Sequence, residues 1–167
     1  GLGDVYKRQE AALLEQLEHC QTPVVVDADA LNILANHRHT LTHLPKGSIL
    51  TPHPKELERL TGKCQDSYER LTKACELAHA ANVHIILKGA YSAIITPAGK
   101  CYFNPTGNPG MATPGSGDVL TGILLALEAE GYSPEDACRL GVYIHGLAGD
   151  IAAEKFGEIS MTAGDIV

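Results

Sequence analysis

The chain has 167 residues, of which 20 are acidic and 13 are basic, and its net charge is −7. This length suits a single domain with a sizeable core. There is no basic cluster, which argues against nucleic acid as a partner, and no apolar run approaches the ~20 residues of a membrane span. The five cysteines are widely spaced and form no Cys-x-x-Cys pair, so we expect free thiols and a cytoplasmic location.

Residues 1–9 fit poorly with the sequence that follows them. They show no clear hydrophobic period, and one interpretation is that they are not native to the gene. Residues 10–20 carry apolar side chains at helical spacing, which predicts a helix. No linker, repeat or low-complexity tract follows, so residues 10–167 are interpreted as one domain.

The first predicted strand is the apolar run at residues 24–26. Its β-branched content and lack of alternation are typical of a strand buried on both faces of a parallel sheet. It runs into Asp27 and Asp29, and carboxylates at the carboxyl end of a parallel strand lie where α/β proteins place ligands. The alternative is that Asp29 caps the short helix predicted up to Asn36.

A second buried strand is predicted at residues 48–50, and it leads into Pro52, His53 and Pro54. A residue before proline is restricted to extended conformations, so His53 is held in a stiff segment. Pro54 suits the first turn of a helix. His53 and Glu56 are therefore expected at a strand-to-helix turn, and the alternative for His53 is an ordinary surface position.

The middle of the chain predicts the change from a parallel to an antiparallel sheet. Residues 66–82 have one apolar face at helical spacing. Strands are predicted at residues 83–87 and 91–96, and the turn at residues 97–100 leads into a further strand at residues 101–103. Two strands so close in sequence pair antiparallel, so we predict an α/β fold with an antiparallel edge.

The stretch from Asn104 to Asp118 is a glycine- and proline-rich loop that opens a helix predicted over residues 118–130. Small residues such as Gly115 and Ser116 let a ligand approach the helix start, whose N–H groups suit a phosphate, so we interpret them as an anion loop. Asp118 would stand beside that anion, which is useful if the carboxylate takes a proton. The alternative is that Asp118 only caps the helix.

Two more helical segments complete the chain. The helix at residues 118–130 has apolar residues on nearly every face, so we expect it to be buried. Ser133 and Pro134 start a helix to about Phe156. Three glycines inside that helix each cost about 1 kcal/mol against alanine, which indicates close helix packing. Residues 160–167 resemble a further helix start.

Four segments, in this order and spacing, resemble the NAD(P)H-hydrate dehydratase family of the ribokinase-like superfamily: Asp27–Asn32, Thr51–Leu57, Leu87–Gly89 and Asn104–Asp118. The resemblance implies a mostly parallel central sheet with helices on both faces and an antiparallel edge, without the amino-terminal third of the family's domain. It also implies a homo-oligomer at full length. A sheet without its neighbouring strands exposes edges and apolar faces, so we expect this chain, made alone, to be unstable or to aggregate.

The same resemblance implies a metabolite-repair reaction. The family removes water from the S epimer of hydrated NADH or NADPH, with magnesium as cofactor and ADP as the phosphoryl donor that gives AMP and phosphate; other members use ATP. Two alternatives remain open: a ribokinase-like kinase for a small alcohol, and an inactive fragment that binds nucleotide. The sequence around His53 and the segment at residues 104–108 look like the dehydratase.

The resemblance also assigns roles to individual residues. His53, Asp118 and Gly1 match positions that contact the hydrated dinucleotide, and Asp118 is the catalytic candidate. Glu56 matches an acidic position that organises magnesium indirectly. The AMP part of the nucleotide is assigned to Lys88, Gly89, Ala90, Tyr91, Ser92 and Gly117. Pro114 and Ser116 stand where many members have glycine and threonine.

Overall fold

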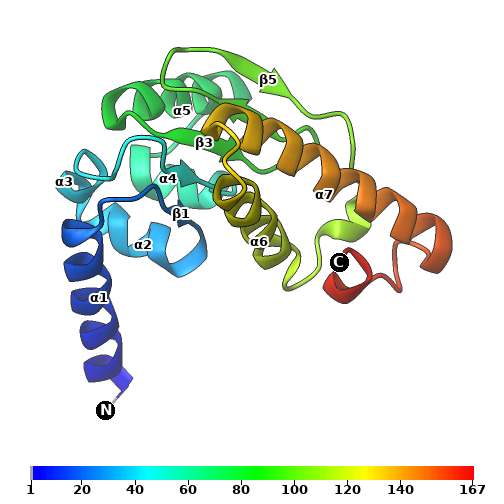
Figure 1. Ribbon diagram of the computed structural model, residues 1–167, viewed down its shortest axis with the longest axis horizontal. Coiled ribbons are helices and arrows are strands. Elements are labelled where there is room, and N and C mark those ends of the chain that lie inside the picture. Colours follow the sequence, from blue (N-terminus) through cyan, green and yellow to red (C-terminus); the bar gives the residue numbers. More distant parts are fainter. Residues whose placement is uncertain (1) are drawn as a thin grey trace.

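A five-stranded mixed sheet forms the centre of the molecule, with the strands in the order β1-β2-β3-β4-β5 (Figure 1). The structure is a computed structural model that describes residues 2–167, with side chains from residue 7 onward. Its strands are β1 (Val25–Val26), β2 (Ile49–Leu50), β3 (His84–Leu87), β4 (Ala93–Ile95) and β5 (Cys101–Phe103). Its α-helices are α1 (Leu2–His19), α2 (Ala28–Asn36), α3 (Arg38–Leu41), α4 (Pro54–Thr61), α5 (Ser67–Ala81), α6 (Ser116–Ala129) and α7 (Pro134–Phe156), with 3-10 turns at Pro109–Met111 and Ala163–Asp165.

The pairing of the strands confirms the predicted change of direction. β1 pairs with β2, and β2 with β3, in parallel. β3 pairs with β4, and β4 with β5, antiparallel. Because the carboxyl ends of parallel strands meet at one edge, the segments that follow β1, β2 and β3 emerge side by side.

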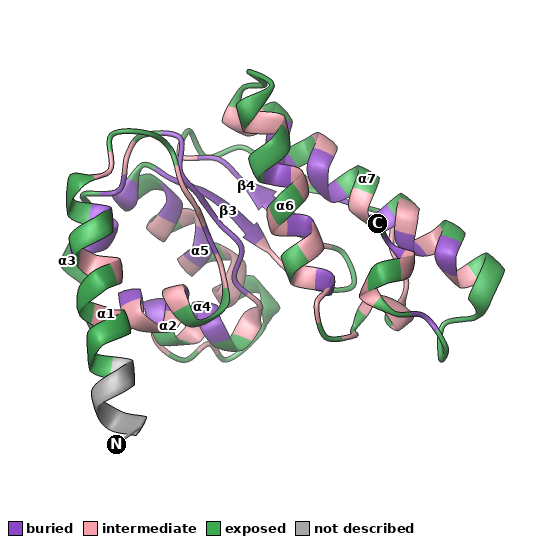
Figure 2. Cartoon of the chain, turned by 60° about the horizontal axis from the view of Figure 1, so that its bottom comes forward, coloured by how far each residue is buried: buried purple, intermediate pink, exposed green. Residues whose placement is uncertain are grey.

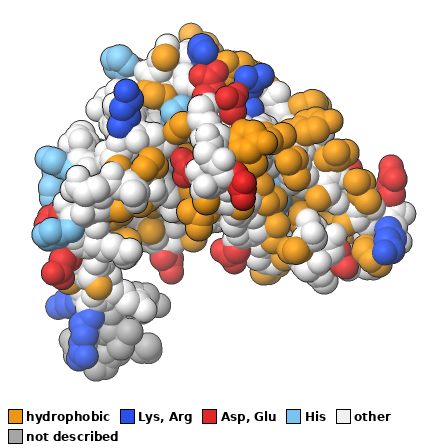
Figure 3. Space-filling model, viewed as in Figure 1, with side chains coloured by type: hydrophobic (Ala, Val, Ile, Leu, Met, Phe, Trp, Pro, Cys, Tyr) orange, Lys and Arg blue, Asp and Glu red, His pale blue; other side chains and the backbone are white. Residues whose placement is uncertain are grey.

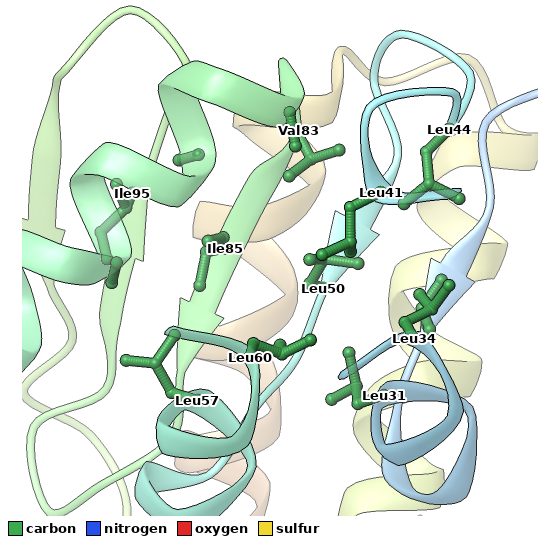
Figure 4. Packing of buried hydrophobic residues seen from close by; sticks show 14 of the residues in the cluster. Leu31, Leu34, Leu41, Leu44, Leu50, Leu57, Leu60, Val83, Ile85 and Ile95 are labelled. Atoms are coloured by element: carbon green, nitrogen blue, oxygen red, sulfur yellow. The ribbon is translucent and has the colours of Figure 1, made fainter. Parts of the chain in front are cut away.

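Two apolar cores lie on opposite faces of the sheet. Neighbouring residues of a strand point to opposite faces, so Leu50 and Ile85 pack with α2, α4 and α5 (Figure 4), whereas Ile49 and Ile86 pack with α6 and α7. Figure 2 shows the buried residues on the sheet and on the helix faces turned towards it. The expected α/β architecture with helices on both faces is therefore confirmed.

Residues 2–9 continue the helix that the sequence predicted from residue 10. α1 projects away from the sheet (Figure 1), and Leu17, 5% exposed, and an ion pair between Glu10 and His37 at 2.6 Å connect it to the rest. Gly1 lies outside the described residues. The division into a foreign segment at residues 1–9 and a partial domain at residues 10–167 stays a prediction.

One expectation for the carboxyl-terminal half is wrong, and another holds only in part. α6 is not buried all round: Leu120 and Leu124 face the sheet, whereas Leu125 is 57% exposed. An apolar composition on every face therefore did not indicate complete burial here. Residues 160–167 form only the short 3-10 turn, which Thr162 and Asp165 close with a reciprocal capping box.

The glycines of α7 allow the close packing that the sequence indicated. A β-carbon built onto Gly141 would lie 2.9 Å from a methyl carbon of Leu124 on α6. One on Gly146 would lie 2.8 Å from the carbonyl carbon of Thr106, and one on Gly149 would overlap the side chain of Met111. The helix thus approaches α6 and the loop before it more closely than an alanine would permit.

We predict that Gly146→Ala destabilises the protein. The added methyl group meets backbone that cannot move freely, and overpacking of this kind costs about 1–3 kcal/mol. Gly122→Ala on α6 is the matched control, because nothing lies within 4 Å of its β-carbon and alanine is favoured over glycine in a helix by about 1 kcal/mol. In urea unfolding, the first variant should lose stability and the second should not; a Gly146→Ala variant as stable as Gly122→Ala contradicts the packing argument.

An apolar stripe runs along the exposed side of α7. It consists of Tyr143, Ile144, Leu147 and Ile151, each at least 40% exposed, and Figure 3 shows apolar side chains gathered along this side of the molecule. Exposed apolar patches of this kind favour association.

We therefore expect the chain made alone to self-associate in a concentration-dependent way, and Ile151→Lys, at 58% exposure, to reduce the association. The measurement is light scattering after gel filtration over a range of concentrations. A monodisperse, cooperatively melting chain contradicts this prediction.

Candidate functional site

Three strand ends and one helix start meet at a single edge of the sheet. Beyond the strands, the Thr51 N–H donates to the Val26 carbonyl at 3.1 Å, and the Lys88 N–H donates to the Pro52 carbonyl at 2.9 Å. These bonds continue the parallel ladder past the ends of β1, β2 and β3. The segments that carry Asp27, His53 and Lys88 are therefore held in register at this edge.

Asp27 and Lys88 form an ion pair across this edge. The ammonium Nζ of Lys88 lies 2.8 Å from Oδ1 of Asp27, and the two side chains are 25% and 12% exposed. Asp27 also occupies the N-cap position of α2, although its side chain makes no cap hydrogen bond. The alternative that Asp29 caps this helix is therefore wrong.

The start of α6 lies directly against this ion pair. A β-carbon built onto Gly117 would lie 3.2 Å from Oδ2 of Asp27 and 3.6 Å from Nζ of Lys88. Gly115 is the N-cap, and its φ of +88° is a conformation that favours glycine. The first-turn N–H groups of a helix have no partner inside the helix, and among the described residues none is found for those of Gly117 and Asp118.

Asp118 is the third residue of α6, so the alternative that it is the helix cap is wrong. Asp118 is exposed to solvent, and its carboxylate makes no hydrogen bond or ion pair within the described part of the chain. A free carboxylate beside orphan N–H groups has the position that a proton acceptor next to a bound phosphate needs. Its catalytic role stays a prediction at this point.

His145 of α7 contacts Ser116 at the start of α6. The sequence alone did not indicate this residue. Its Nε2 lies 2.9 Å from the carbonyl oxygen of Ser116 and 3.3 Å from its hydroxyl. Burial lowers the pKa of His145, the positive charge of Lys88 lowers it further, and the Ser116 carbonyl acts in the opposite direction. The only signal in the sequence was its place beside Gly146 in the glycine-rich stretch of α7.

The loop between β5 and α6 is tied to α7 by its polar side chains. Buried Asn104 donates to the Val142 carbonyl at 3.4 Å, and Thr106 donates to the Tyr143 carbonyl at 3.1 Å. The carboxylate of Asp150 accepts the Gly107 N–H at 2.9 Å and a side-chain hydrogen of Asn108 at 3.0 Å. The loop is therefore preorganised by a neighbouring helix rather than by a ligand.

His53 and Glu56 form a helix cap. Nδ1 of His53 accepts the N–H groups of Lys55 and Glu56 at 3.1 and 3.2 Å, and Oε2 of Glu56 accepts the His53 N–H at 2.8 Å. Glu56 is only 5% exposed, and its other oxygen lies 3.4 Å from Nε2 of His53. Oε2 of Glu56 thus has a hydrogen-bond partner within this turn, whereas Oε1 only lies near the imidazole ring, and the indirect part of Glu56 in holding magnesium stays a prediction.

The segment at residues 88–92 forms a tight turn after β3. The hydroxyl of Ser92 accepts the Gly89 N–H at 3.4 Å and donates to the Gly89 carbonyl at 3.3 Å. A pocket of about 390 Å³ lies beside this turn, and Tyr91, 72% exposed, stands at it. Lys88 belongs to both the pocket and the ion pair with Asp27, so it connects the turn to the start of α6.

The described residues contain no group of three or more metal-ligating side chains close enough to hold an ion. Mg²⁺ usually binds through one or two carboxylates and the phosphates of a substrate, with several waters. The carboxylate of Asp118 has no partner among the described residues and lies beside the unpartnered N–H groups of α6, so its chemistry fits such an ion. Glu56 fits it less well because it is buried and its Oε2 already accepts a backbone N–H.

Comparison with known proteins identifies the family. A family model described as NAD(P)H-hydrate dehydratase matches residues 1–167. The chain belongs to this family. It is 49% identical to the bifunctional NAD(P)H-hydrate repair enzyme Nnr of Moorella thermoacetica over 157 residues, which cover 92% of this chain and 29% of the relative. It is 40% identical to the ADP-dependent (S)-NAD(P)H-hydrate dehydratase of Neisseria meningitidis over 154 residues, which cover 89% of this chain and 52% of that relative.

A solved structure of the family has the same fold. The ADP/ATP-dependent NAD(P)H-hydrate dehydratase of Bacillus subtilis, co-crystallised with ATP/Mg²⁺, superposes with a TM-score of 0.76 at 29% identity, over 92% of this chain and 54% of that one. The chain thus spans about a third to a half of the length of these relatives. No described helix is both long and apolar enough to cross a membrane.

The cap formed by His53 predicts a difference between two substitutions. His53→Ala removes the acceptor for two N–H groups and should cost about 1 kcal/mol of unfolding free energy. His53→Asn removes the imidazole but keeps a capping oxygen, so it should retain most of the stability. Equal urea midpoints for the histidine and alanine proteins contradict the cap.

Proposed function

We propose that this chain carries the site for nucleotide-dependent dehydration of hydrated NADH and NADPH, acting on the S epimer with ADP as phosphoryl donor. The observation that carries the proposal is the carboxylate of Asp118, which has no partner among the described residues and lies in the first turn of α6, where the neighbouring Gly117 lies against the ammonium of Lys88. Membership of the NAD(P)H-hydrate dehydratase family supports it, and a relative named ADP-dependent supports the choice of donor.

The start of α6, Lys88 and Asp118 have different roles in the proposed phosphoryl transfer. The orphan N–H groups at the start of α6 and the ammonium of Lys88 bind and neutralise the terminal phosphate. Asp118 takes the proton from the ring hydroxyl of the hydrated nicotinamide as its oxygen attacks the terminal phosphorus, and AMP leaves. Phosphate then leaves from the phosphorylated ring carbon, the adjacent ring carbon loses a proton, and the double bond formed between them restores the reduced nicotinamide. Mg²⁺, when bound, supplies further neutralisation of the phosphate charge.

The remaining residues have binding roles in this proposal. The turn at residues 88–92 holds the AMP part of the nucleotide through its backbone and the side chains of residues 89–92, since the ammonium of Lys88 is directed to the terminal phosphate. His53 presents its exposed ring edge to the dinucleotide. Gly117 brings the backbone of α6 close to the phosphate because it has no side chain. The five free cysteines agree with a reducing compartment, and a homo-oligomer is part of the same proposal.

The direct test is to incubate a full-length version of the protein with hydrated NADH, Mg²⁺ and ADP or ATP in turn, and to follow the absorbance of the reduced nicotinamide. We expect recovery with ADP together with release of AMP and phosphate. In a parallel incubation with an added small alcohol, phosphorylation of that alcohol together with no recovery from hydrated NADH points instead to a kinase. Nucleotide binding without either reaction shows a binding fragment.

Asp118→Asn should distinguish a role of Asp118 as proton acceptor from a role in stabilising the start of α6. Asparagine has a similar shape but cannot take the hydroxyl proton, and general-base catalysis contributes roughly 10²–10⁴-fold. We expect a fall in turnover of at least ~10²-fold, with an unchanged melting temperature and ADP affinity that is retained or increased because a negative charge beside the phosphates is gone. Paired measurements of melting, ADP binding and dehydration check this; turnover within a few-fold of the unmodified protein rejects Asp118 as the base.

A further inference from the structure

The ion pair between Asp27 and Lys88 brings together two strand ends that are 61 residues apart in sequence. A lysine ammonium on its flexible four-carbon stem is a mobile point charge when nothing holds it. Here Oδ1 of Asp27 accepts from it at 2.8 Å, and both side chains are largely buried. The position of the ammonium is therefore fixed before any ligand arrives.

The ammonium of Lys88 is held beside the first turn of α6. The site of a β-carbon on Gly117 is 3.6 Å from the Lys88 ammonium and 3.2 Å from the free oxygen of Asp27. The pKa of His145, which lies under the same turn, is lowered mainly by burial and further by the charge of Lys88. The distances thus place this cation at the helix start.

The backbone conformation of the residue after Asp27 indicates that the surrounding structure fixes the position of Asp27. Ala28 has a φ of +51°, a left-handed conformation that L-residues avoid because the β-carbon crowds the following carbonyl oxygen. Such strain persists only where the surrounding structure fixes the backbone. Asp27 makes no cap hydrogen bond to α2 either, so its carboxylate remains available for Lys88.

We propose that Asp27 is a positioning residue that holds the Lys88 ammonium against the terminal phosphate of the nucleotide, so that the site prefers a nucleoside diphosphate to a monophosphate. The inference rests on the proposed function, in which the terminal phosphorus must lie near the hydroxyl that Asp118 deprotonates. That requirement places the terminal phosphate at the first turn of α6, beside Lys88. AMP lacks this phosphate, so the product loses the contact with Lys88 and is released.

Positioning and simple electrostatics predict opposite effects of removing Asp27. If the carboxylate only adds negative charge near the phosphates, its removal raises the affinity for ADP. If it orders Lys88, its removal lowers the affinity, because binding must then immobilise a free side chain, at a loss of roughly 2- to 10-fold. The sign of the change therefore decides between the two.

The experiment measures ADP and AMP binding by calorimetry, with Mg²⁺, in the unmodified protein and in four variants. Lys88→Met should lower ADP affinity roughly 10- to 100-fold, the usual effect of losing a charged hydrogen bond, with a much smaller effect on AMP. Asp27→Ala should lower the ratio of ADP to AMP affinity roughly 2- to 10-fold. Asp27→Asn keeps one oxygen that can accept from the ammonium, so it should retain more of the preference than the alanine variant.

Lys100→Met is the matched control. Lys100 pairs with Glu135 at 3.1 Å and precedes β5, at the opposite end of the sheet from Lys88, so the same change of charge should leave the ADP to AMP ratio unaltered. Melting temperatures show whether each variant is folded, and Lys88→Met and Asp27→Asn carry the test if Asp27→Ala unfolds.

Three results overturn the proposal: an unmodified protein that binds ADP no more tightly than AMP, an Asp27→Ala variant with an unchanged or higher ratio, or an equal loss of both nucleotides together with a lower melting temperature. The dehydration assay is separate from these measurements. Absence of dehydration with the ADP preference and its response to Asp27 intact rejects the proposed reaction and leaves the positioning role standing.

Discussion

The close approach of α7 to the loop before α6 is the contact on which the site depends. Gly146 and Gly149 leave room for Thr106 and Met111 against the helix, and Asp150 then reaches the Gly107 N–H. A loop rich in glycine has much conformational freedom to lose on binding a ligand. Because α7 has already fixed it, the start of α6 keeps one position relative to the strand ends.

This fixed helix start explains how the charges of the site coexist. Orphan N–H groups give the first turn of α6 a partial positive charge, and the Lys88 ammonium adds a full one. Asp27 balances that ammonium directly, while burial lowers the pKa of His145 under the Ser116 carbonyl. The ordered ammonium of Lys88 therefore faces the first turn of α6, and burial disfavours a second positive charge on His145.

The sequence predicted the parts of the fold that depend on local signals. The cap at Ser133, the turn at residues 97–100 and the apolar runs that form β1, β2 and β3 each have a cause within a few residues, and the structure confirms them. The prediction that α6 is buried was wrong because the composition of a helix does not say how many neighbours pack against it. The resemblance to a family added the order of the motifs, which no local signal contains.

The parts of the site that the sequence did not reveal are contacts between distant segments. Asp27 and Lys88 are both visible as polar residues at strand ends, but nothing in either segment says that one holds the other. His145 was hidden for the same reason, since its partner Ser116 lies 29 residues earlier on another helix. His53 shows the converse: its local environment was correctly predicted as a stiff turn, yet its cap on α4 appears only when the direction of its ring is known.

Asp27 and Asp118 are two carboxylates near one helix start that differ in burial and in partners. Asp27 is largely buried and bound to a lysine through one oxygen, so its charge is already used in holding a cation. Asp118 is exposed and has no partner among the described side chains, so its oxygens are free to accept a proton. An acceptor tied to a lysine would have to break that contact to turn towards a substrate hydroxyl. The proposed division between an Asp27 that orders Lys88 and an Asp118 that accepts the proton therefore rests on their different partners, although both are aspartates beside Gly117.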